Sequence, residues 1–266
     1  PFTYPLSVYA FDPNFRTGYL QQWQFAVERR VTSDSIVRAA YVGSKGSKLW
    51  WGRDLNAARF VPGASTVANT DARRPLAPQI AQLDWSESRG ASNYHALQLT
   101  YNKRFRQGLT FNGAYSWSKS IDLGSQGRAL LRTPHPNNPN ANRGRSEFHL
   151  THVFVGSFVW DLPFLQQRNT FASKLLGGWR VSGITTAQSG QVFTVAAGRA
   201  ASLSGTGSER ADWNGQELRI SGDRTRAQEL ARWFNTAAFT APPDGSWGSA
   251  GRGILEGPGL FNFDMA

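Results

Sequence analysis

Apolar and polar residues alternate along several segments of this chain, which is the pattern of β-strands with one apolar face. The segment 109–118 shows it most clearly, with Leu, Phe, Gly, Tyr and Trp at odd positions and Thr, Asn, Ala and Ser at even ones. The segments 94–103 and 19–28 follow the same two-residue period. The pattern predicts about seven strands, at residues 17–30, 34–44, 92–105, 109–119, 148–161, 178–197 and from 259 onward.

Short and long links alternate between these strands. Residues 31–33 and 106–108 form short links, whereas long outer loops are expected near 45–91, 120–147 and 198–258. Soluble domains rarely keep long irregular loops on one side only, while outer-membrane barrels combine short turns at one end with long loops at the other. We therefore predict an all-β fold, an antiparallel meander of transmembrane strands that forms part of a large outer-membrane β-barrel and is incomplete within 1–266. A short helical turn is expected within 164–176.

The polar faces of these strands help to distinguish a membrane barrel from a soluble sheet, which alternates in the same way. They carry mostly Ser, Thr, Asn and Gln rather than Lys and Glu, and the best strands run about ten residues or more, enough for a tilted bilayer crossing. Both observations favour the membrane barrel. The residues expected to face the lumen are Gln24, Gln98, Asn112 and Ser116. The aromatic residues expected at the membrane interfaces, where an apolar ring with a polar atom is favoured, are Trp23, Tyr101, Trp117, Trp160 and Trp179.

The composition narrows the range of partners. Lys plus Arg number 29 and Asp plus Glu number 18, which gives a net charge of +11. The basic residues are scattered over links and strand ends, without the continuous basic helix or stripe of a nucleic-acid-binding protein, so we expect solvated charges and no nucleic acid. The absence of cysteine excludes disulfides and thiolate metal sites, and the absence of a long apolar run excludes a transmembrane helix.

No residue pattern gives positive support for an enzyme, a cofactor or a metal ion. His149 and His152 would share a face on a helix, but at the start of a strand they are expected to point to opposite faces, which argues against a shared metal ion. The segment 43–48 lacks the ending and the following helix of a phosphate-binding loop. The tryptophans expected to be exposed in long links, which would suit sugar stacking or loop packing, are Trp50, Trp51, Trp85 and Trp247.

A series of strings in this sequence resembles the barrel of Oar-like TonB-dependent transporters. The strings keep their order and approximate spacing over nearly the whole chain, which makes the resemblance specific to a family. They belong to the framework of the barrel and include no ligand-contact motif. The strings lie at 19–23, 41–46, 93–99, 102–105, 108–111, 115–120, 152–154, 160–164, 177–179, 182–184, 188–194, 234–239 and 251–259.

The resemblance implies a barrel in the outer membrane of a Gram-negative-type bacterium that imports a large substrate, with energy passed through TonB to an N-terminal plug. The implied partners are outer-membrane lipid and, in the full-length protein, the plug domain and TonB; the transported substrate stays unknown. Within 1–266 we identify no plug. His149 and Thr151 stand where the family tends to carry an acidic residue and an arginine, so a charge network at these positions is not expected here.

Two alternatives stay open at this point. One is a passive outer-membrane barrel or surface adhesin that binds through its loops, and the other is a soluble all-β glycan-binding domain. For the membrane barrel we also expect that the strands within 1–266 form a curved sheet with open edges, because so few strands cannot close a wide barrel. Unpaired backbone groups in lipid cost several kcal/mol each, so such a sheet is expected to be unstable or to aggregate without further strands.

Overall fold

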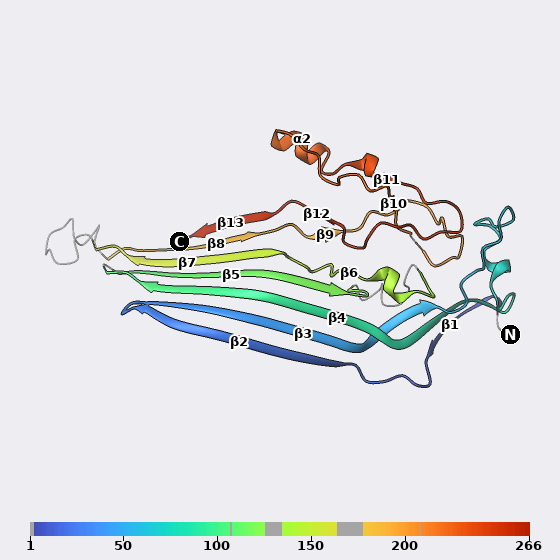
Figure 1. Cartoon of the computed structure of the whole chain (residues 1–266), viewed down its shortest axis with the longest axis horizontal. Helices are drawn as coiled ribbons and strands as arrows, with labels where there is room; N and C mark the ends of the chain where they lie inside the picture. The colour runs from blue at the N-terminus through green and yellow to red at the C-terminus, as the bar shows by residue number, and fades with distance from the viewer. Residues whose placement is uncertain (1–2, 107, 126–134, 164–177, 208) are drawn as a thin grey trace.

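The structure is a computed structural model that describes residues 3–106, 108–125, 135–163, 178–207 and 209–266. Its main feature is one sheet in which seven strands of the described part follow one another in the order β13-β8-β7-β5-β4-β3-β2 (Figure 1). All neighbouring pairs along this path are antiparallel, which confirms the predicted antiparallel meander. The strands are β2 (Tyr19–Thr32), β3 (Ser35–Asp54), β4 (Ile80–Arg104), β5 (Leu109–Asp122), β7 (His152–Asp161), β8 (Arg180–Gln188) and β13 (Leu260–Met265).

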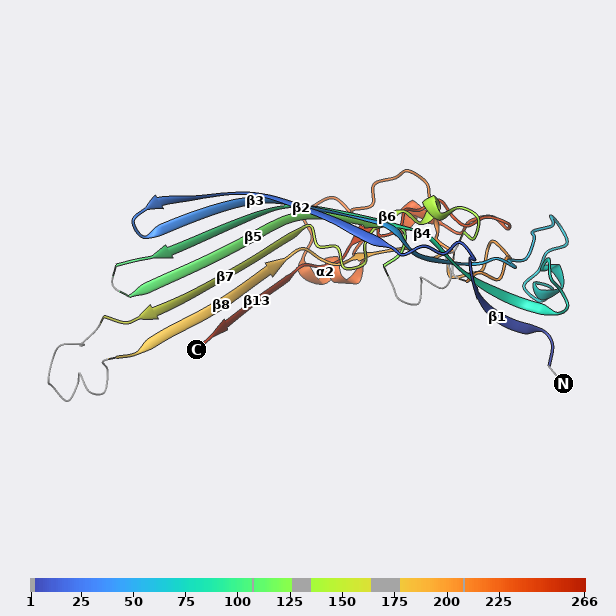
Figure 2. The same ribbon diagram turned by 90° about the horizontal axis from the view of Figure 1, so that it is seen from below.

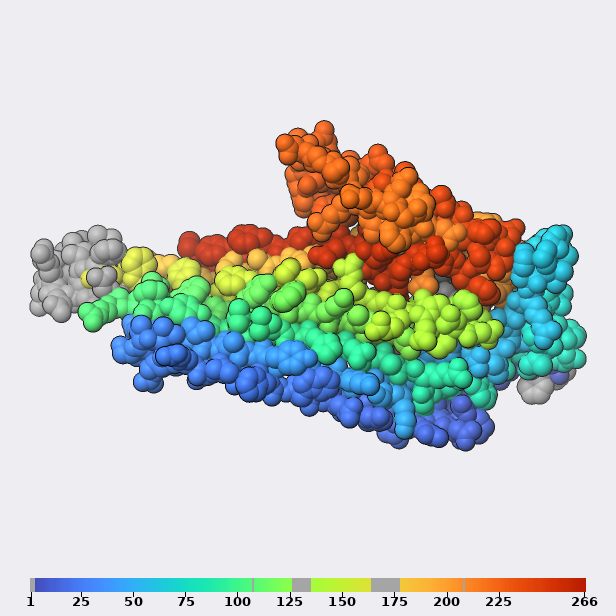
Figure 3. Space-filling view, viewed as in Figure 1, coloured from blue at the N-terminus to red at the C-terminus, as the bar shows by residue number. Residues whose placement is uncertain are grey.

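The sheet is a single open layer. Seen from below, its strands fan out side by side with a progressive twist (Figure 2), and the space-filling view shows one elongated slab (Figure 3). Among the described residues, β2 and β13 each pair with one neighbour only, so the barrel is not closed. No helix in the described residues is long and apolar enough to cross a membrane.

The two ends of the sheet differ as the link lengths predict. At the short-turn end, Phe105 donates a backbone hydrogen bond to Leu109 at 2.7 Å, and Gly108 adopts a φ of +78°, which L-residues disfavour. Lys103 pairs with Asp34 at 2.9 Å in the neighbouring turn. The hydrogen bond from Thr32 and then that from Lys103 hold the pKa of the Asp34 carboxyl below its usual value.

At the other end, here called the long-loop end, the strands run further than predicted. Because β3 continues to Asp54 and β4 begins at Ile80, the predicted loop 45–91 is too long, and the link is 55–79. The extension contains two register shifts, between Gly46 and Leu49 and between Leu49 and Trp51. A shift of one residue exchanges the two faces of a strand, so the alternation breaks there and hides the strand from a pattern search.

Further elements at the long-loop end were not predicted. β1 (Leu6–Phe11) pairs in parallel with the start of β4, an exception to the antiparallel pattern. β6 (Gly144–Arg145) pairs with the end of β5, beyond the residues of β5 that pair with β7. The remaining short elements are β9 (Val192–Phe193), β10 (Asp212–Trp213), β11 (Phe239–Thr240), β12 (Leu255–Glu256), α2 (Arg226–Ala231) and the 3-10 turns Asp71–Arg73, Pro139–Asn142 and Thr236–Ala238.

Two other predicted boundaries are wrong. The strand predicted at 148–161 begins only at His152, and the strand predicted at 178–197 runs from Arg180 to Gln188. The second strand ends where Gly190 packs so closely on the 257–259 segment that a Cβ atom would lie 1.8 Å from the carbonyl oxygen of Gly257. The helical turn predicted within 164–176 lies outside the described residues.

Burial is distributed in an unusual way over this fold. The long strands leave large apolar side chains uncovered, such as Phe25 at 70% and Phe261 at 73% exposure. The largest fully buried side chains lie instead at the long-loop end and include Trp51, Glu209, Asn56 and Asp54. A folded chain does not leave so wide an apolar surface to water, so the face of the sheet must meet an apolar environment, and the loops hold a polar core of their own.

Candidate functional site at the long-loop end

The strand register assigns every sheet residue to one of two faces, because directly paired residues point to the same side. The row Phe25, Tyr41, Leu97 and Trp117 runs across four strands and belongs to the apolar face. The row Ala40, Gln98 and Ser116 belongs to the opposite, polar face. The structure therefore brings the apolar sides of the three best-alternating segments onto one continuous surface.

Four of the five predicted interface aromatics lie at two levels. Trp117 pairs with His152 and Trp160 pairs with Leu109. The positions 109 and 117 are eight residues apart on β5, which is about 26 Å along the strand at 3.3 Å per residue. With the tilt of barrel strands this corresponds to about 19–22 Å across the membrane, somewhat less than the apolar band of outer-membrane barrels. Trp23, opposite Gly43, lies near the upper level. Tyr101, opposite Gly113, lies midway between the two levels, four residues from each, which does not match the predicted interface position. The exposed Trp179 directly precedes β8 at the same end as Trp160. Their role as interface anchors stays a prediction.

The four residues predicted to face the lumen all lie on the polar face. Gln98 is directly opposite Ser116, and Asn112 is opposite Asn102 on one side and Ser157 on the other. Gln24 pairs with Val42 on β3. Valines from β7 share this face, so it is less uniformly polar there. Contact with an aqueous lumen stays a prediction for these residues.

The links at the long-loop end are fastened to the sheet by buried arginines. Arg252 donates to the carboxylate of Asp122 at the end of β5 and, at 2.7 Å, to its carbonyl oxygen. It also donates to the carbonyl oxygens of Asn142 at 2.9 Å and Gly144 at 3.1 Å. Arg252 therefore joins the links 123–151 and 189–259 to the same strand end.

A second arginine fastens the link 55–79. Arg74 pairs with Asp54 at 2.6 Å, with both side chains almost fully buried. The Asp54 carboxylate also accepts the backbone N–H groups of Asn56 at 3.0 Å and Leu83 at 3.2 Å. Removing one partner of such a buried pair typically costs about 3–5 kcal/mol, so this link is firmly attached to β3 and β4.

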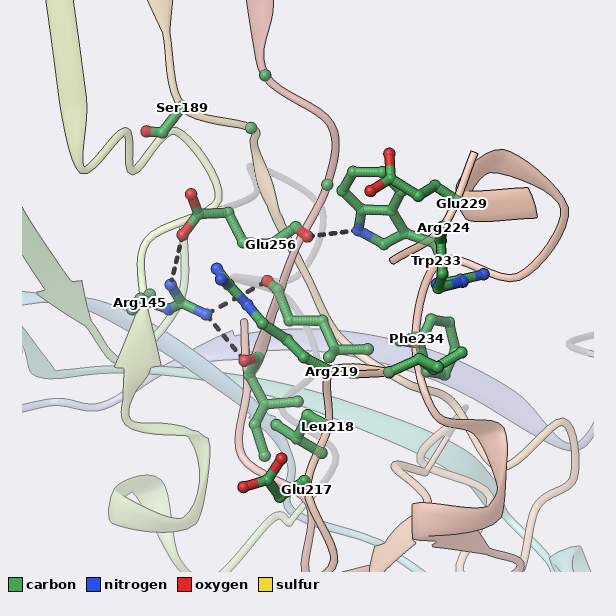
Figure 4. Close-up of a pocket in the computed structure, with 16 residues that line it drawn as sticks. Arg145, Ser189, Glu217, Leu218, Arg219, Arg224, Glu229, Trp233, Phe234 and Glu256 are labelled. Atoms are coloured by element: carbon green, nitrogen blue, oxygen red, sulfur yellow. Dashed lines mark hydrogen bonds and ion pairs between the residues drawn. The ribbon is translucent and has the colours of Figure 1, made fainter. Parts of the chain in front are cut away.

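The long-loop end also contains a groove of ≈ 750 Å³ that is the candidate binding site (Figure 4). One wall is formed by Arg145, which donates to the carbonyl oxygen of Ile254 at 2.9 Å and pairs with Glu256 at 3.2 Å. The opposite wall is formed by α2 and the residues after it, where the indole Nε1 of Trp233 donates to the carbonyl oxygen of Glu256 at 2.6 Å. The groove is therefore bordered by β6, β12 and the segment around α2.

The groove contains charges of both signs. Arg219 and Glu217 are exposed, and no described residue forms an ion pair or side-chain hydrogen bond with the guanidinium or the carboxylate. Figure 4 shows the Arg219 side chain extended toward Glu256. Trp233 and Phe234 add aromatic surface. Such a lining suits a polar organic molecule that offers hydrogen-bonding groups together with a ring or an apolar patch.

His149 and His152 have different surroundings. His149 precedes β7 instead of lying in it and is 3% exposed. Its Nδ1 accepts the backbone N–H of Ser120 at 3.1 Å, and its Nε2 lies 3.2 Å from the hydroxyl of Thr151. Burial, followed by the charge of Arg145, lowers the pKa of His149. His149 and Thr151 are the two positions at which the Oar-like family tends to carry an acidic residue and an arginine. Here they make an uncharged contact instead.

His152 starts β7 on the apolar face, and its Nδ1 lies 2.7 Å from the hydroxyl of Tyr115. In the described residues no group of three or more His, Cys, Asp or Glu side chains is placed to hold a metal ion. The residues present give no support for a metal centre at this pair.

Sequence reasoning missed the importance of buried arginines. The basic residues were expected to be solvated, which is wrong for Arg74, Arg210 and Arg252, each less than 10% exposed. Trp51 was expected to be exposed in a loop, but it lies in β3 and is buried. The sequence gives little indication that Arg252 is buried. It stands between two glycines, a composition typical of a mobile loop, and its partner carboxylate belongs to a distant strand.

The chain was compared with protein families, curated proteins and solved structures. A family model with the description "Outer membrane beta barrel domain" matches residues 1–266. No curated protein and no solved structure matches the chain. The family match agrees with the antiparallel meander and its continuous apolar face.

Proposed function

We propose, from the premise that the chain belongs to the family of outer membrane beta barrel domains, that its sheet forms part of the wall of a barrel through which a solute crosses the bacterial outer membrane. The observation that carries this proposal is the apolar face that runs through Phe25, Tyr41, Leu97 and Trp117. Lipid covers such a face, while the polar face with Gln98 lines an aqueous interior.

The location in the outer membrane settles one alternative. A soluble glycan-binding domain is not retained, because the family is an outer-membrane one and because the apolar face of the sheet stays uncovered by the rest of the described chain. We expect the free edges of β2 and β13 to pair with further strands in the membrane, since each unpaired backbone group there costs several kcal/mol.

The finer function that we propose is energised import of a solute by the TonB system, with a plug domain inside the full-length barrel. Its support is the ordered series of strings that resembles Oar-like transporters, from 19–23 to 251–259. A passive barrel or an adhesin would share the same wall, so energy coupling is the point that the experiment must decide. We propose no catalytic step.

The proposed first contact of the solute is the groove between β6, β12 and α2. Two residues support this proposal, Arg219 and Glu217, whose charges have no partner in the described chain. The aromatic surface of Trp233 lies beside them. Unpaired charges next to an aromatic ring at the mouth of a barrel are available to a solute without first breaking a contact within the protein.

The test uses the full-length protein in its native outer membrane. Cells are offered labelled solutes from panels of siderophores, oligosaccharides and peptides, with and without a protonophore, and the purified protein is examined in planar bilayers. We expect uptake that the protonophore abolishes, and bilayers without steady conductance. Steady conductance with protonophore-insensitive uptake would establish a passive barrel, and cell attachment without any uptake would establish an adhesin.

The groove is tested with matched arginine variants. Arg219→Met is expected to raise the solute concentration for half-maximal uptake about 10–150-fold, the effect of losing one charged hydrogen bond. Arg199→Met removes an exposed guanidinium that pairs with Asp244 outside the groove and is expected to leave uptake unchanged. Equal uptake by both variants would reject the groove as the binding site.

A further inference from the structure

A third buried arginine at the long-loop end lacks the partner that the other two have. Arg210 is 8% exposed, and its Nη2 donates to the carbonyl oxygen of Ala141 at 2.6 Å. Its Nε and Nη1 are buried without a hydrogen-bond partner. These two nitrogens carry most of the five N–H donors of a guanidinium.

No carboxylate of the described residues compensates the charge of Arg210. It takes part in no ion pair there, whereas Arg74 pairs with Asp54 and Arg252 with Asp122. Burial, and then the positive charge of Arg252, lower the pKa of Arg210. Glu209 is adjacent in sequence but forms no ion pair with Arg210: its Oε1 accepts from Ser202, and its Oε2 is buried without a hydrogen-bond partner. A buried charge that stays unpaired costs several kcal/mol, so a negative partner from outside the described residues would stabilise this guanidinium.

Two other residues with unused polar atoms belong to the segments packed against Arg210. The rings of His135 and Trp247 stack with centroids 4.3 Å apart, and both His135 Nδ1 and Trp247 Nε1 are buried without a partner. Gly248, which follows Trp247, approaches the Arg210 backbone so closely that a Cβ atom would lie 1.9 Å from its carbonyl oxygen. Burial is the largest cause that lowers the pKa of His135, and the positive charge of Arg210 lowers it further, while a backbone hydrogen bond raises it. Four unused nitrogen atoms therefore belong to three residues in one neighbourhood.

We propose that Arg210, Trp247 and His135 form a binding site for an oxyanion, a phosphate or carboxylate group, inside the folded links at the long-loop end. A guanidinium and an indole offer N–H donors only, and an imidazole with a free Nδ1 adds a third donor in the appropriate tautomer. Several donors from three side chains match several acceptor oxygens on one group, which a guanidinium binds strongly. The site lies apart from the groove, whose lining includes none of the three residues.

The oxyanion has two possible sources, a free inorganic anion that completes the fold of the links or a group on a larger solute. The full-length protein in detergent is titrated with inorganic phosphate, acetate and glycerol phosphate against chloride at equal ionic strength, and thermal unfolding is followed. We expect phosphate or acetate, at ten times its dissociation constant, to raise the midpoint temperature of unfolding by about 2–4 °C. Equal affinity for inorganic phosphate and glycerol phosphate identifies a free anion, and tighter binding of the ester identifies a group on a solute.

Variants decide whether Arg210 is responsible. Arg210→Met is expected to lose the anion-dependent shift and, in chloride, to unfold no earlier than the parent protein, because it removes an uncompensated buried charge. Arg89→Met, which removes an exposed guanidinium near Glu87, should keep the full shift. Trp247→Phe, which keeps the ring but not the N–H, should weaken binding about 5–10-fold. A parent protein without any anion-dependent shift, or an unchanged shift in Arg210→Met, would overturn the proposal; the Trp247 variant keeps the test valid if the Arg210 variant does not fold.

Discussion

The hydroxyl of Tyr41 on β3 lies 2.7 Å from Nδ1 of His95 on β4, and the two rings stack with an interplanar angle of 19°. The same arrangement recurs between Tyr115 on β5 and His152 on β7, at 2.7 Å and 17°. In both cases the histidine lies two positions from the residue directly opposite the tyrosine, a diagonal that aromatic side chains can span.

Both diagonals join strands that are connected by a long link. A tight turn fixes the register of a hairpin such as β4 and β5, but β3 and β4, or β5 and β7, have no such turn between them. The tyrosine–histidine pairs provide a specific contact that only one register allows. We infer that they help to set the register of these strand pairs.

The first prediction concerns these pairs. Tyr41→Phe or Tyr115→Phe is expected to lower the free energy of unfolding by about 0.5–1.5 kcal/mol, the usual net value of a hydrogen bond. Denaturant unfolding of the full-length protein in lipid vesicles measures it. Tyr94→Phe is the control, because no hydrogen bond of its hydroxyl is present in the described structure. If the tyrosine variants lose no more unfolding free energy than Tyr94→Phe, the pairs do not help to set the strand register.

The second prediction concerns the contact between Gly43 and Trp23. A Cβ atom on Gly43 would lie 2.3 Å from the indole Nε1 of Trp23, so no side chain fits while the ring keeps its place over the glycine. Gly43→Val is expected to displace the indole and to cost about 1–3 kcal/mol, measured by the same unfolding assay. Ala39→Val, on the same face of the same strand, should change stability by less than half of that. Equal effects would show that the indole is free to move.

The alternation of 109–118 was enough to predict β5 and its two faces, because the period of two is a direct consequence of strand geometry. The same holds for β2 and for the part of β4 near Leu97 and Leu99. Register followed from the short turns, which leave few possible pairings. These parts of the fold depend on neighbours in sequence, and for that reason the sequence pattern contains them.

The long-loop end depends on contacts between distant residues and could not be predicted in the same way. Arg252 reads as a loop residue until Asp122, 130 positions earlier, is placed beside it. β1 pairs through its backbone, which a side-chain pattern does not report. The groove around Arg219 also joins four separate segments. Its residues have no spacing in the sequence that a motif search would recognise.

The third prediction tests the attachment of the links. Arg252→Met leaves the buried carboxylate of Asp122 without its cation, which is expected to cost about 3–5 kcal/mol. Because the pair joins the links to the end of β5, the expected result is faster proteolysis within 189–259 while the strands stay protected. Arg180→Met, which breaks the exposed pair with Asp161, should cost at most about 1 kcal/mol. Simultaneous cleavage of links and strands in the Arg252 variant would argue against separate attachment.

The fourth prediction concerns pH and His149, which lies in the link before β7. Its Nδ1 accepts the N–H of Ser120, so the folded state favours the neutral ring. Burial is the largest cause that lowers its pKa below the ordinary value of 6.5, followed by the charges of Arg145 and, more weakly, Lys119, while Glu256 acts in the opposite direction. Below pH 6.5 the unfolded chain therefore takes up a proton that the folded protein does not.

The sign of the pH effect follows from this difference. The contribution of His149 to stability is fully present above pH 6.5 and is lost as the pH falls through the folded pKa. The measurement is the unfolding free energy of the full-length protein between neutral and mildly acidic pH. His149→Gln should reduce the slope, leaving the part that His135, whose pKa burial also lowers, contributes in the same direction. If His149→Gln and the parent lose stability equally on acidification, the neutral His149 has no part in holding the link to β5.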